Sequence, residues 1–354
     1  MSLIFTSNQI LERARGLTFD DVLMMPNHSQ ITSRFNPSLS TRLTKNLKIE
    51  TPIISANMDT ISETEMCLAM ARLGGVGILH RFMSAESQIK MVKELINEKK
   101  NIPHLIVAAS VGVKEDGMRR ADALADCGIE LLTVDIAHGD SVLMYETLEY
   151  IKKKYPKIEV IAGNTATFEG VKGLIEHGAD AIKVGIGPGS MCTTRIITGC
   201  GVPQLTAIAL GVEAAKKYDV PIIADGGLKT SGDMAKALAA GASSLMVGSL
   251  LSGTLETPGE IKNGMKKYRG MASKDAQVSW RGDLPKGMAP EGESQFIPCK
   301  GTAENVVNEL TGGIRSSMTY LNAQTINEMK EKARFMEMTA ASVFESKPHG
   351  TMSN

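Results

Sequence analysis

The chain has no excess of charge of either sign, since its 354 residues include 39 Lys and Arg and 39 Asp and Glu. We therefore expect no surface for nucleic acid or an anionic membrane, although backbone amides at a helix N-terminus can still bind a phosphate. No apolar run reaches the length of a membrane span, and residues 1–14 lack the basic start and apolar centre of a signal peptide. These absences predict a soluble, cytoplasmic protein.

Cysteine and histidine patterns are missing as well. The five cysteines form no C-x-x-C pair, which argues against a disulfide framework or a zinc site and is typical of a reducing compartment. The six histidines show no metal-ligand spacing, so we expect no catalytic transition metal.

What the sequence does contain is a repeated alternation of two kinds of segment. Short apolar, β-branched runs cover residues 52–55, 75–80, 105–110, 131–135, 160–164, 181–185, 221–225 and 244–248. Helical stretches lie between most of them, as at 86–99, 142–154, 168–177 and 231–240. Continuous apolar strands alternating with helices predict a parallel sheet covered on both faces, and about eight units predict an α/β fold of the (β/α)8 TIM-barrel type.

Length alone suits one large domain or two ordinary ones. With the strand pattern, we expect residues 1–354 to form a single catalytic barrel domain with an N-terminal extension, a mobile lid at 268–301 and a C-terminal segment at 302–354. The lid region is rich in Gly, Pro and charge and contains the single tryptophan, Trp280. A loop of that length is usually functional. Residues 344–350 look like a frayed terminus.

Polar residues end many of the predicted strands and should meet at the C-terminal mouth of the barrel, where such enzymes place their sites. They are Ser55, Asn57, Asp59, His80, Asp135, His138, Asn164, Cys192 and Asp225. Each could instead cap a helix or close a turn, but their shared position predicts a functional site.

Two glycine turns, Asp225-Gly226-Gly227 and Gly248-Ser249, follow the last two predicted strands. Barrels often bind phosphate there, against a short helix N-terminus. We expect a phosphate site, with Asp225 placed to accept hydrogen bonds from ribose hydroxyls. A capped turn is the alternative for either motif alone.

The stretch GIGPGSMCTTR at residues 185–195 places a thiol on a glycine loop beside two hydroxyls. Glycine allows close approach to a ligand, a thiol can attack an electrophile, and a hydroxyl can pass a proton or hold a water. A tight turn with a small buried cysteine is the alternative for an arbitrary motif of this kind.

The longer string GIGPGSMCTTRIITGCGVPQLTAI resembles the active-site loop of the IMP dehydrogenase and GMP reductase family. Further similar motifs are GLTFDDVLMMP, PIISANMDT, GGVGILHRFMS, VDIAHGDS, VIAGNTAT, IIADGGLKTSGDMAKALAAGA, MVGSLLSGTLETPGE, YRGM and PEG. The resemblance implies a barrel that binds a purine nucleoside monophosphate and a nicotinamide cofactor, generally as a homotetramer.

The resemblance also implies residue roles. Cys192 would be the nucleophile, assisted by Thr194 and either Arg281 or Glu291. The nucleotide would be bound by Met58, Ser190, Asp225, Gly226, Gly227, Gly248, Ser249, Tyr268, Gly270, Met271 and Glu291. Asp135, His138 and Asn164 would lie on the NAD side. Carbonyls of Gly187, Gly189 and Cys192 would hold a potassium ion, completed by a neighbouring subunit's motif similar to Glu345-Ser346-Lys347.

The chain departs from the dehydrogenase pattern in two ways. It has no room for a CBS domain pair between Gly77 and Gly112, and its short lid carries Trp280-Arg281 in place of an adjacent Arg-Tyr pair. YRGM, VDIAHGDS, the cysteine loop and the ESKPHG tail favour oxidation of IMP to XMP with NAD+. ANMDT and the short lid favour the alternative, reduction of GMP to IMP and ammonia with NADPH. A nucleotide binder without activity is a third interpretation, which the intact Cys192-Thr193-Thr194 disfavours.

Overall fold

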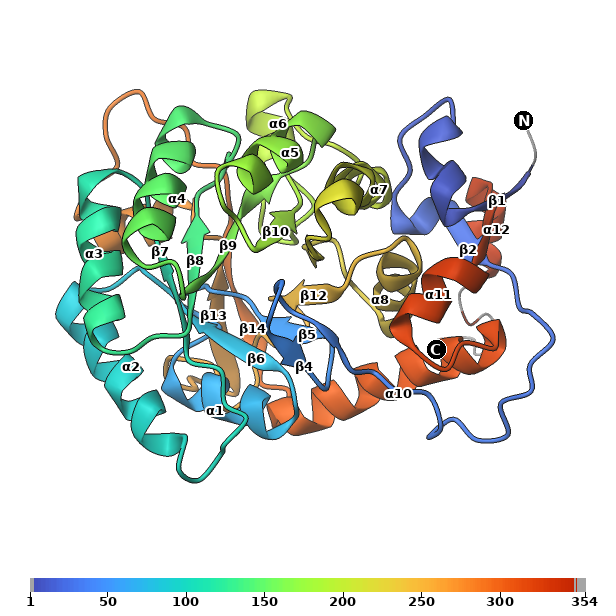
Figure 1. Ribbon diagram of the computed structural model, residues 1–354, viewed down its shortest axis with the longest axis horizontal. Coiled ribbons are helices and arrows are strands. Elements are labelled where there is room, and N and C mark those ends of the chain that lie inside the picture. Colours follow the sequence, from blue (N-terminus) through green and yellow to red (C-terminus); the bar gives the residue numbers. More distant parts are fainter. Residues whose placement is uncertain (1–2, 347, 349–354) are drawn as a thin grey trace.

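Eight parallel strands close into a barrel at the centre of the computed structural model, which describes residues 3–346 and 348 (Figure 1). The strands are β5 (Ile53–Ser55), β6 (Val76–Leu79), β7 (Ala108–Val111), β8 (Leu131–Asp135), β9 (Glu159–Thr165), β10 (Ala181–Val184), β11 (Ile222–Asp225) and β12 (Ser244–Val247). The predicted TIM-barrel fold is confirmed. The third strand begins at Ala108 and not at Leu105, because the Leu105 N–H closes a turn on the Ile102 carbonyl (3.0 Å).

Helices cover the outside of the barrel, as expected for a parallel sheet. They are α1 (Thr64–Arg72), α2 (Ala85–Glu98), α3 (Lys114–Asp126), α4 (Val142–Lys154), α5 (Phe168–Glu176), α7 (Gln204–Ala215), α8 (Ser231–Ala239) and α10 (Ala303–Leu321). Helix α2 shows why these segments are helical. The Ser84 hydroxyl caps it by accepting the Ser87 N–H (3.1 Å), and its buried residues Gln88, Val92 and Leu95 lie on one face. No described helix is both long and apolar enough to cross a membrane.

Side chains fill the inside of the barrel, so it is a packed core and not a pore. Each strand contributes at least one buried apolar residue to this cluster, and β6 contributes two: Ile54, Val76, Ile78, Ala108, Leu131, Ile161, Ala181, Ile223 and Met246. The alternate residues face the helices and form the outer core. The interior is therefore closed, and a ligand can enter only at an end of the barrel.

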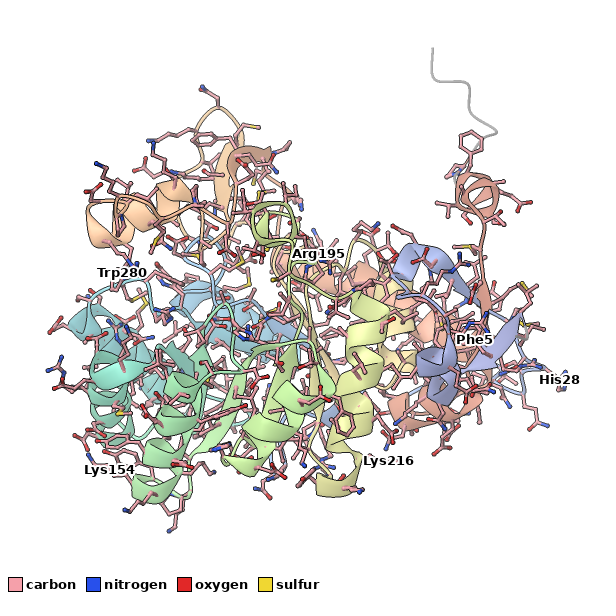
Figure 2. The ribbon with its side chains drawn as sticks, turned by 90° about the horizontal axis from the view of Figure 1, so that it is seen from above. Phe5, His28, Lys154, Arg195, Lys216 and Trp280 are labelled. Carbon is pink, nitrogen blue, oxygen red and sulfur yellow. The ribbon has the colours of Figure 1, made fainter. Side chains whose placement is uncertain are left out.

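The two ends of the chain meet in a three-stranded antiparallel sheet beside the barrel, formed by β1 (Ile4–Thr6), β15 (Arg334–Glu337) and β2 (Val22–Met24). Phe5, which Figure 2 labels, stacks on Phe335 with ring centroids 5.9 Å apart. Short elements flank this sheet: η1 (Ser7–Glu12), η2 (Phe19–Asp21) and α11 (Ile326–Lys332). Strands β3 (Thr41–Arg42) and β4 (Lys48–Ile49) form a separate antiparallel pair, and Ile49 packs with the residues that fill the barrel. Helix α12 (Ala340–Glu345) includes Phe344 and Glu345, so the expectation of a frayed terminus is wrong for these residues. Lys347 lies outside the described residues.

The predicted lid is a small folded unit and not an irregular loop. Strands β13 (Met265–Arg269) and β14 (Ser294–Pro298) form an antiparallel hairpin, and α9 (Lys274–Arg281) lies between them. The Ser273 hydroxyl caps the N-terminus of α9 by accepting a hydrogen bond from the Ala276 N–H (3.2 Å). In Figure 2 the lid, with Trp280, lies over the same end of the barrel as Arg195, and Lys154 and Lys216 lie at the other end. The lid therefore covers one mouth.

We predict that Gly77→Ala destabilises the barrel. A Cβ at this position of β6 would lie 2.5 Å from the Cα of Cys67 and 2.8 Å from its Sγ, so α1 would have to move. Overpacking of this kind costs about 1–3 kcal/mol of unfolding free energy, which denaturant titration measures. The control is Gly312→Ala in α10, where nothing lies within 4 Å of the added Cβ. This control should gain about 0.5–1 kcal/mol from helix propensity. Equal stability of the two variants would contradict this account of the packing.

Candidate active site

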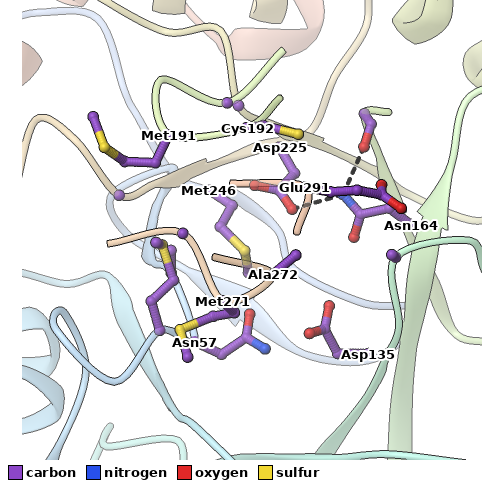
Figure 3. A pocket seen from close by; sticks show the side chains of 18 of the residues that line it. Asn57, Asp135, Asn164, Met191, Cys192, Asp225, Met246, Met271, Ala272 and Glu291 are labelled. Atoms are coloured by element: carbon purple, nitrogen blue, oxygen red, sulfur yellow. Dashed lines mark hydrogen bonds between the residues drawn. The ribbon is translucent and has the colours of Figure 1, made fainter. Parts of the chain in front are cut away.

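A cavity of about 480 Å³ lies at the mouth of the barrel under the lid, and Figure 3 shows Cys192, Asp225, Asn164, Asp135 and Glu291 around it. Most of the residues expected from the sequence line this cavity: Met58, Asp135, Asn164, Gly187, Gly189, Ser190, Cys192, Thr194, Asp225, Gly226, Gly227, Gly248, Ser249, Tyr268, Gly270, Met271, Arg281 and Glu291. Exposed His138 is not among the lining residues, and Glu345 and Ser346 are at the end of α12.

The loop after β10 reaches the cavity because of its glycines. Gly185 has φ +152°, and a Cβ there would lie 2.1 Å from the Asp225 carbonyl oxygen, so only glycine lets the loop pass so close to β11. The loop then turns, with the Cys192 N–H donating to the Gly189 carbonyl (3.1 Å), before the short helix α6 (Thr194–Thr198). This path brings the thiol over the open end of the barrel.

A continuous line of hydrogen bonds joins the thiol to the lid. Cys192 Sγ donates to Thr194 Oγ1 (3.1 Å), and Thr194 Oγ1 donates to Glu291 Oε2 (2.8 Å). Backbone bonds from Thr193 N to Glu291 O (3.1 Å) and from Glu293 N to Met191 O (2.9 Å) hold the two segments together. A thiol, a hydroxyl and a carboxylate in this order can pass a proton between a nucleophile and a substrate group.

Lys183 is the most important site residue that the sequence analysis missed. Its side chain is 3% exposed, and its ammonium lies 2.8 Å from Asp135 Oδ1 and 2.8 Å from Asp225 Oδ2 and also donates to Asn164 Oδ1. Asn164 Nδ2 donates to Asp225 Oδ2 as well (2.9 Å). A lysine inside the apolar run Ala181–Val184 was the available signal, because a buried ammonium needs anionic partners.

The charges of this cluster stabilise one another. Burial alone would lower the pKa of Lys183, but Asp135 and Asp225 raise it above its usual value. Burial alone would raise the pKa of Asp135, but Lys183 and Arg81, with a hydrogen bond from Asn57, hold it below its usual value. Lys183 and Asp135 therefore remain ionised at neutral pH.

The part of the cavity beyond Asp225 suits a phosphate. Gly226 and Gly227 both have positive φ (+89° and +78°), a conformation that favours glycine. The Tyr268 hydroxyl lies 3.1 Å from Ser190 Oγ. Burial raises the pKa of Tyr268, so its phenol remains a neutral donor. Gly248 lies against this phenol, because a Cβ there would be 3.3 Å from the Tyr268 hydroxyl oxygen.

Several polar residues expected at the mouth instead make structural contacts. Ser55 Oγ bonds to Ser62 Oγ (2.7 Å), and His80 Nε2 lies 3.2 Å from Glu63 Oε1. Asp59 pairs with Arg269 at the base of the lid, and its N–H donates to Met271 Sδ (3.4 Å). Asp59 therefore fixes the lid base and Met271 and does not line the cavity.

The free edge of the lid is held by aromatic contacts that the sequence did not indicate. Phe82 packs edge-to-face on Trp280, with ring centroids 6.3 Å apart and planes at 85°. The Arg120 guanidinium lies 5.9 Å from the centre of the Trp280 ring. Neighbouring Arg81 lines the cavity beside Asp135, and its buried Nε has no hydrogen-bond partner among the described residues. This part of the cavity therefore fits a ligand that offers hydrogen-bond acceptors.

Known proteins match this chain over nearly its whole length. Residues 16–349 match the family model described as the IMP dehydrogenase / GMP reductase domain. A protein from Cryptosporidium parvum named inosine-5'-monophosphate dehydrogenase is 42% identical over 384 residues, covering 95% of each chain. One of the same name from Nitrosopumilus maritimus is 36% identical over 475 residues, covering 97% of this chain and 100% of the other. That alignment is longer than this chain, so the relative carries additional segments.

A solved structure is similar in fold as well as in sequence. It is a cysteine-to-alanine variant of GMP reductase from Trypanosoma brucei in complex with guanosine 5'-monophosphate. Its TM-score is 0.90 and its sequence identity 32%, covering 98% of this chain and 100% of the other.

We predict that Lys183→Met reverses the pH dependence of stability. In the wild type, the lowered pKa of Asp135 stabilises the fold above an unfolded-state pKa of about 3.9, and this contribution is lost as pH falls through the folded value. The raised pKa of Lys183 stabilises the fold below an unfolded-state pKa of about 10.4, and this contribution is lost as the pH rises through the folded-state pKa. The contribution of Lys183 and Asp135 to the free energy of unfolding should therefore not change between about pH 5 and 9.

Without the ammonium, Asp135 and Asp225 lose the cation that they share. The unfolding free energy at pH 7 should fall by about 3–5 kcal/mol and recover as the pH is lowered and a carboxylate gains a proton. Urea titrations across pH measure both effects, and Lys183→Arg is the charge-preserving control. Parallel pH curves for wild type and Lys183→Met would contradict the assigned role of the ammonium.

Proposed function

The chain belongs to the IMP dehydrogenase / GMP reductase family, and we propose that it oxidises inosine 5'-monophosphate to xanthosine 5'-monophosphate with NAD+. The hydrogen-bonded line from Cys192 through Thr194 to Glu291 is the observation that carries the proposal. A protein that only bound nucleotides would need no such nucleophile and proton path.

The nucleotide takes its orientation from both sides of the cavity. Its phosphate binds at the turns of Gly226-Gly227 and Gly248-Ser249, with Ser190 and Tyr268 as further donors, because glycine backbone lets N–H groups approach an anion closely. The ribose hydroxyls donate to Asp225. Met58, Gly270, Met271 and Glu291 contact the base. This orientation brings carbon 2 of the purine to the thiol.

Cys192 then attacks carbon 2 and forms a carbon–sulfur bond, and its proton leaves along Thr194 and Glu291. Loss of hydride from carbon 2 then leaves the Cys192 thioimidate, and NAD+, when bound, would supply the hydride acceptor. Water next attacks carbon 2 of the Cys192 thioimidate, and the carbon–sulfur bond breaks to give XMP and the free thiol. Thr194 accepts the proton of that water, with Arg281 or Glu291 assisting. IMP, NAD+ and water thus give XMP, NADH and a proton.

We place the nicotinamide side of the cavity at Asp135, Asn164 and the nearby His138. The unpartnered Arg81 Nε beside Asp135 supports this, since the amide and phosphate oxygens of a dinucleotide are acceptors. The ion pair of Lys183 with Asp135 and the hydrogen bond that Asn164 donates to Asp225 hold the nicotinamide side and the ribose side of the cavity in fixed positions relative to each other.

The proposal includes a potassium ion and a homotetramer. Carbonyl oxygens of Gly187, Gly189 and Cys192 are suitable hard ligands for a monovalent cation, and the remaining ligands would come from Glu345, Ser346 and Lys347 of another copy. Phe344, beside that motif, is 71% exposed, which supports a contact with a second copy. A cytoplasmic location agrees with five free thiols. A single catalytic domain without CBS domains completes the proposal.

One contact favours a second candidate, the reduction of GMP with NADPH to IMP and ammonia. The Thr194–Glu291 bond could deliver a proton to a departing amine, and the chain has no adjacent Arg-Tyr pair in its lid. The similar solved structure is named GMP reductase.

We predict that Cys192→Ala abolishes turnover while IMP still binds, because the nucleotide contacts other than the thiol remain. Activity is followed by NADH absorbance, and binding by calorimetry. Appreciable turnover by Cys192→Ala would refute the covalent mechanism, and full retention of activity for Cys200→Ala, an exposed cysteine of the same loop, is the control.

Two further variants separate the candidate reactions. For a dehydrogenase, Arg281→Ala should leave the first hydride transfer intact and slow XMP release by roughly 100-fold, the size of one lost acid–base contribution. For a reductase, Arg281→Ala should change little, whereas Glu291→Gln should stop deamination. If Glu291→Gln alone is inactive and IMP with NAD+ yields no NADH, the reductase replaces our proposal.

A further inference from the structure

A second, smaller cavity adjoins the phosphate side of the active site. Its volume is about 230 Å³, and it shares Ser190, Gly227, Leu228 and Ser249 with the active-site cavity. Three of these shared residues are the ones that we place around the nucleotide 5'-phosphate. A group bound in the smaller cavity would therefore lie directly beyond that phosphate.

The remaining wall of the smaller cavity carries two basic side chains. The Arg195 guanidinium donates to the Ile186 carbonyl (3.3 Å) and the Val202 carbonyl (2.6 Å), which fix its position. Lys229 Nζ lies 2.5 Å from Asp20 Oδ2, and both side chains are more than half exposed (61% and 55%). Because Asp20 can turn to solvent, Lys229 is free to exchange this partner for a bound anion, as lysine does in many phosphate sites.

The floor of the cavity is polar and incompletely bonded. Gln204 is 2% exposed, and its Nε2 donates to the Val184 carbonyl (3.0 Å) and the Asp225 carbonyl (3.1 Å). Its Oε1 has no hydrogen-bond partner among the described residues and belongs to a side chain that lines this cavity. A buried acceptor without a donor is costly, and a phosphate oxygen cannot donate to it, so a water should lie between Gln204 Oε1 and a bound anion.

We propose that this cavity binds a second phosphate group, which continues the 5'-phosphate of the bound purine nucleotide. Its volume is below the usual 300–1,000 Å³ of small-molecule pockets, so it suits one phosphate with water and not a second nucleoside. The group is the β-phosphate of a purine nucleoside diphosphate, or a free phosphate bound beside the monophosphate. The inference rests on the proposed function, because it places the 5'-phosphate at Ser190, Gly227 and Ser249.

Such a cavity makes the active site responsive to nucleoside diphosphates. A diphosphate would occupy the substrate position and gain the contact with Lys229, so it would compete with IMP. Lys229 lies outside the groups that hold IMP, and its removal should leave IMP turnover unchanged.

Calorimetric titration of the full chain with IMP, with IDP, and with inorganic phosphate in the presence of IMP tests the proposal. The variants are Lys229→Ala, Asp20→Asn and, as the control, Lys217→Ala at an exposed lysine of η3 (Lys216–Tyr218). We expect IDP to bind the wild type roughly three- to tenfold more tightly than IMP, the effect of one charged contact at a partly exposed site. Lys229→Ala should abolish this difference and Asp20→Asn should increase it, with IMP binding and Lys217→Ala unchanged.

The outcomes of this experiment distinguish a diphosphate from free phosphate as the source of the second group. They also distinguish failure of the second phosphate site from failure of the proposed function. If IDP shows no preference but inorganic phosphate binds beside IMP in a Lys229-dependent way, the second group is free phosphate. If IMP binds but neither ligand depends on Lys229, the second phosphate site is overturned and the proposed function stands. If IMP itself does not bind, both the proposed function and this inference, which depends on it, are refuted.

Discussion

Closure of eight parallel strands is the constraint on which the rest of the structure depends. Because all the strands run in one direction, their carboxyl ends meet at one mouth. The loops that follow must then pass close to one another, as Gly185 does against the Asp225 carbonyl. The thiol loop, the glycine turns at Gly226-Gly227 and Gly248-Ser249 and the lid therefore converge, although they are far apart in the sequence.

The mouth also concentrates charge, and the fold balances it internally. Lys183 points from β10 between Asp135 of β8 and Asp225 of β11, and Asn164 of β9 bonds to both Lys183 and Asp225. Consecutive strands of a closed parallel sheet supply these groups, so the arrangement needs no separate scaffold. The lid adds Glu291, which reaches Thr194 only because residues 291–293 bond to the thiol loop.

The sequence predicted the barrel and most of the cavity for a physical reason. Buried parallel strands are apolar throughout, and a ligand-binding turn after such a strand needs glycine and small polar residues, so both are visible as patterns. Lys183 was missed because its partners come from neighbouring strands that are distant in sequence. The lid was expected to be irregular because neither of its strands has an apolar run and β14 is mostly exposed. The pattern of polar residues at strand ends also included Ser55, His80 and Asp59, which make structural contacts and do not line the cavity.

The central claim is that Cys192 forms a covalent bond to the purine, and peptide mass spectrometry tests it most directly. The protein is mixed with IMP and NAD+, quenched within one turnover and digested. We expect a nucleotide mass on the peptide that contains Cys192, with no such mass when NAD+ is omitted. A fully active preparation that never carries this adduct would contradict the account.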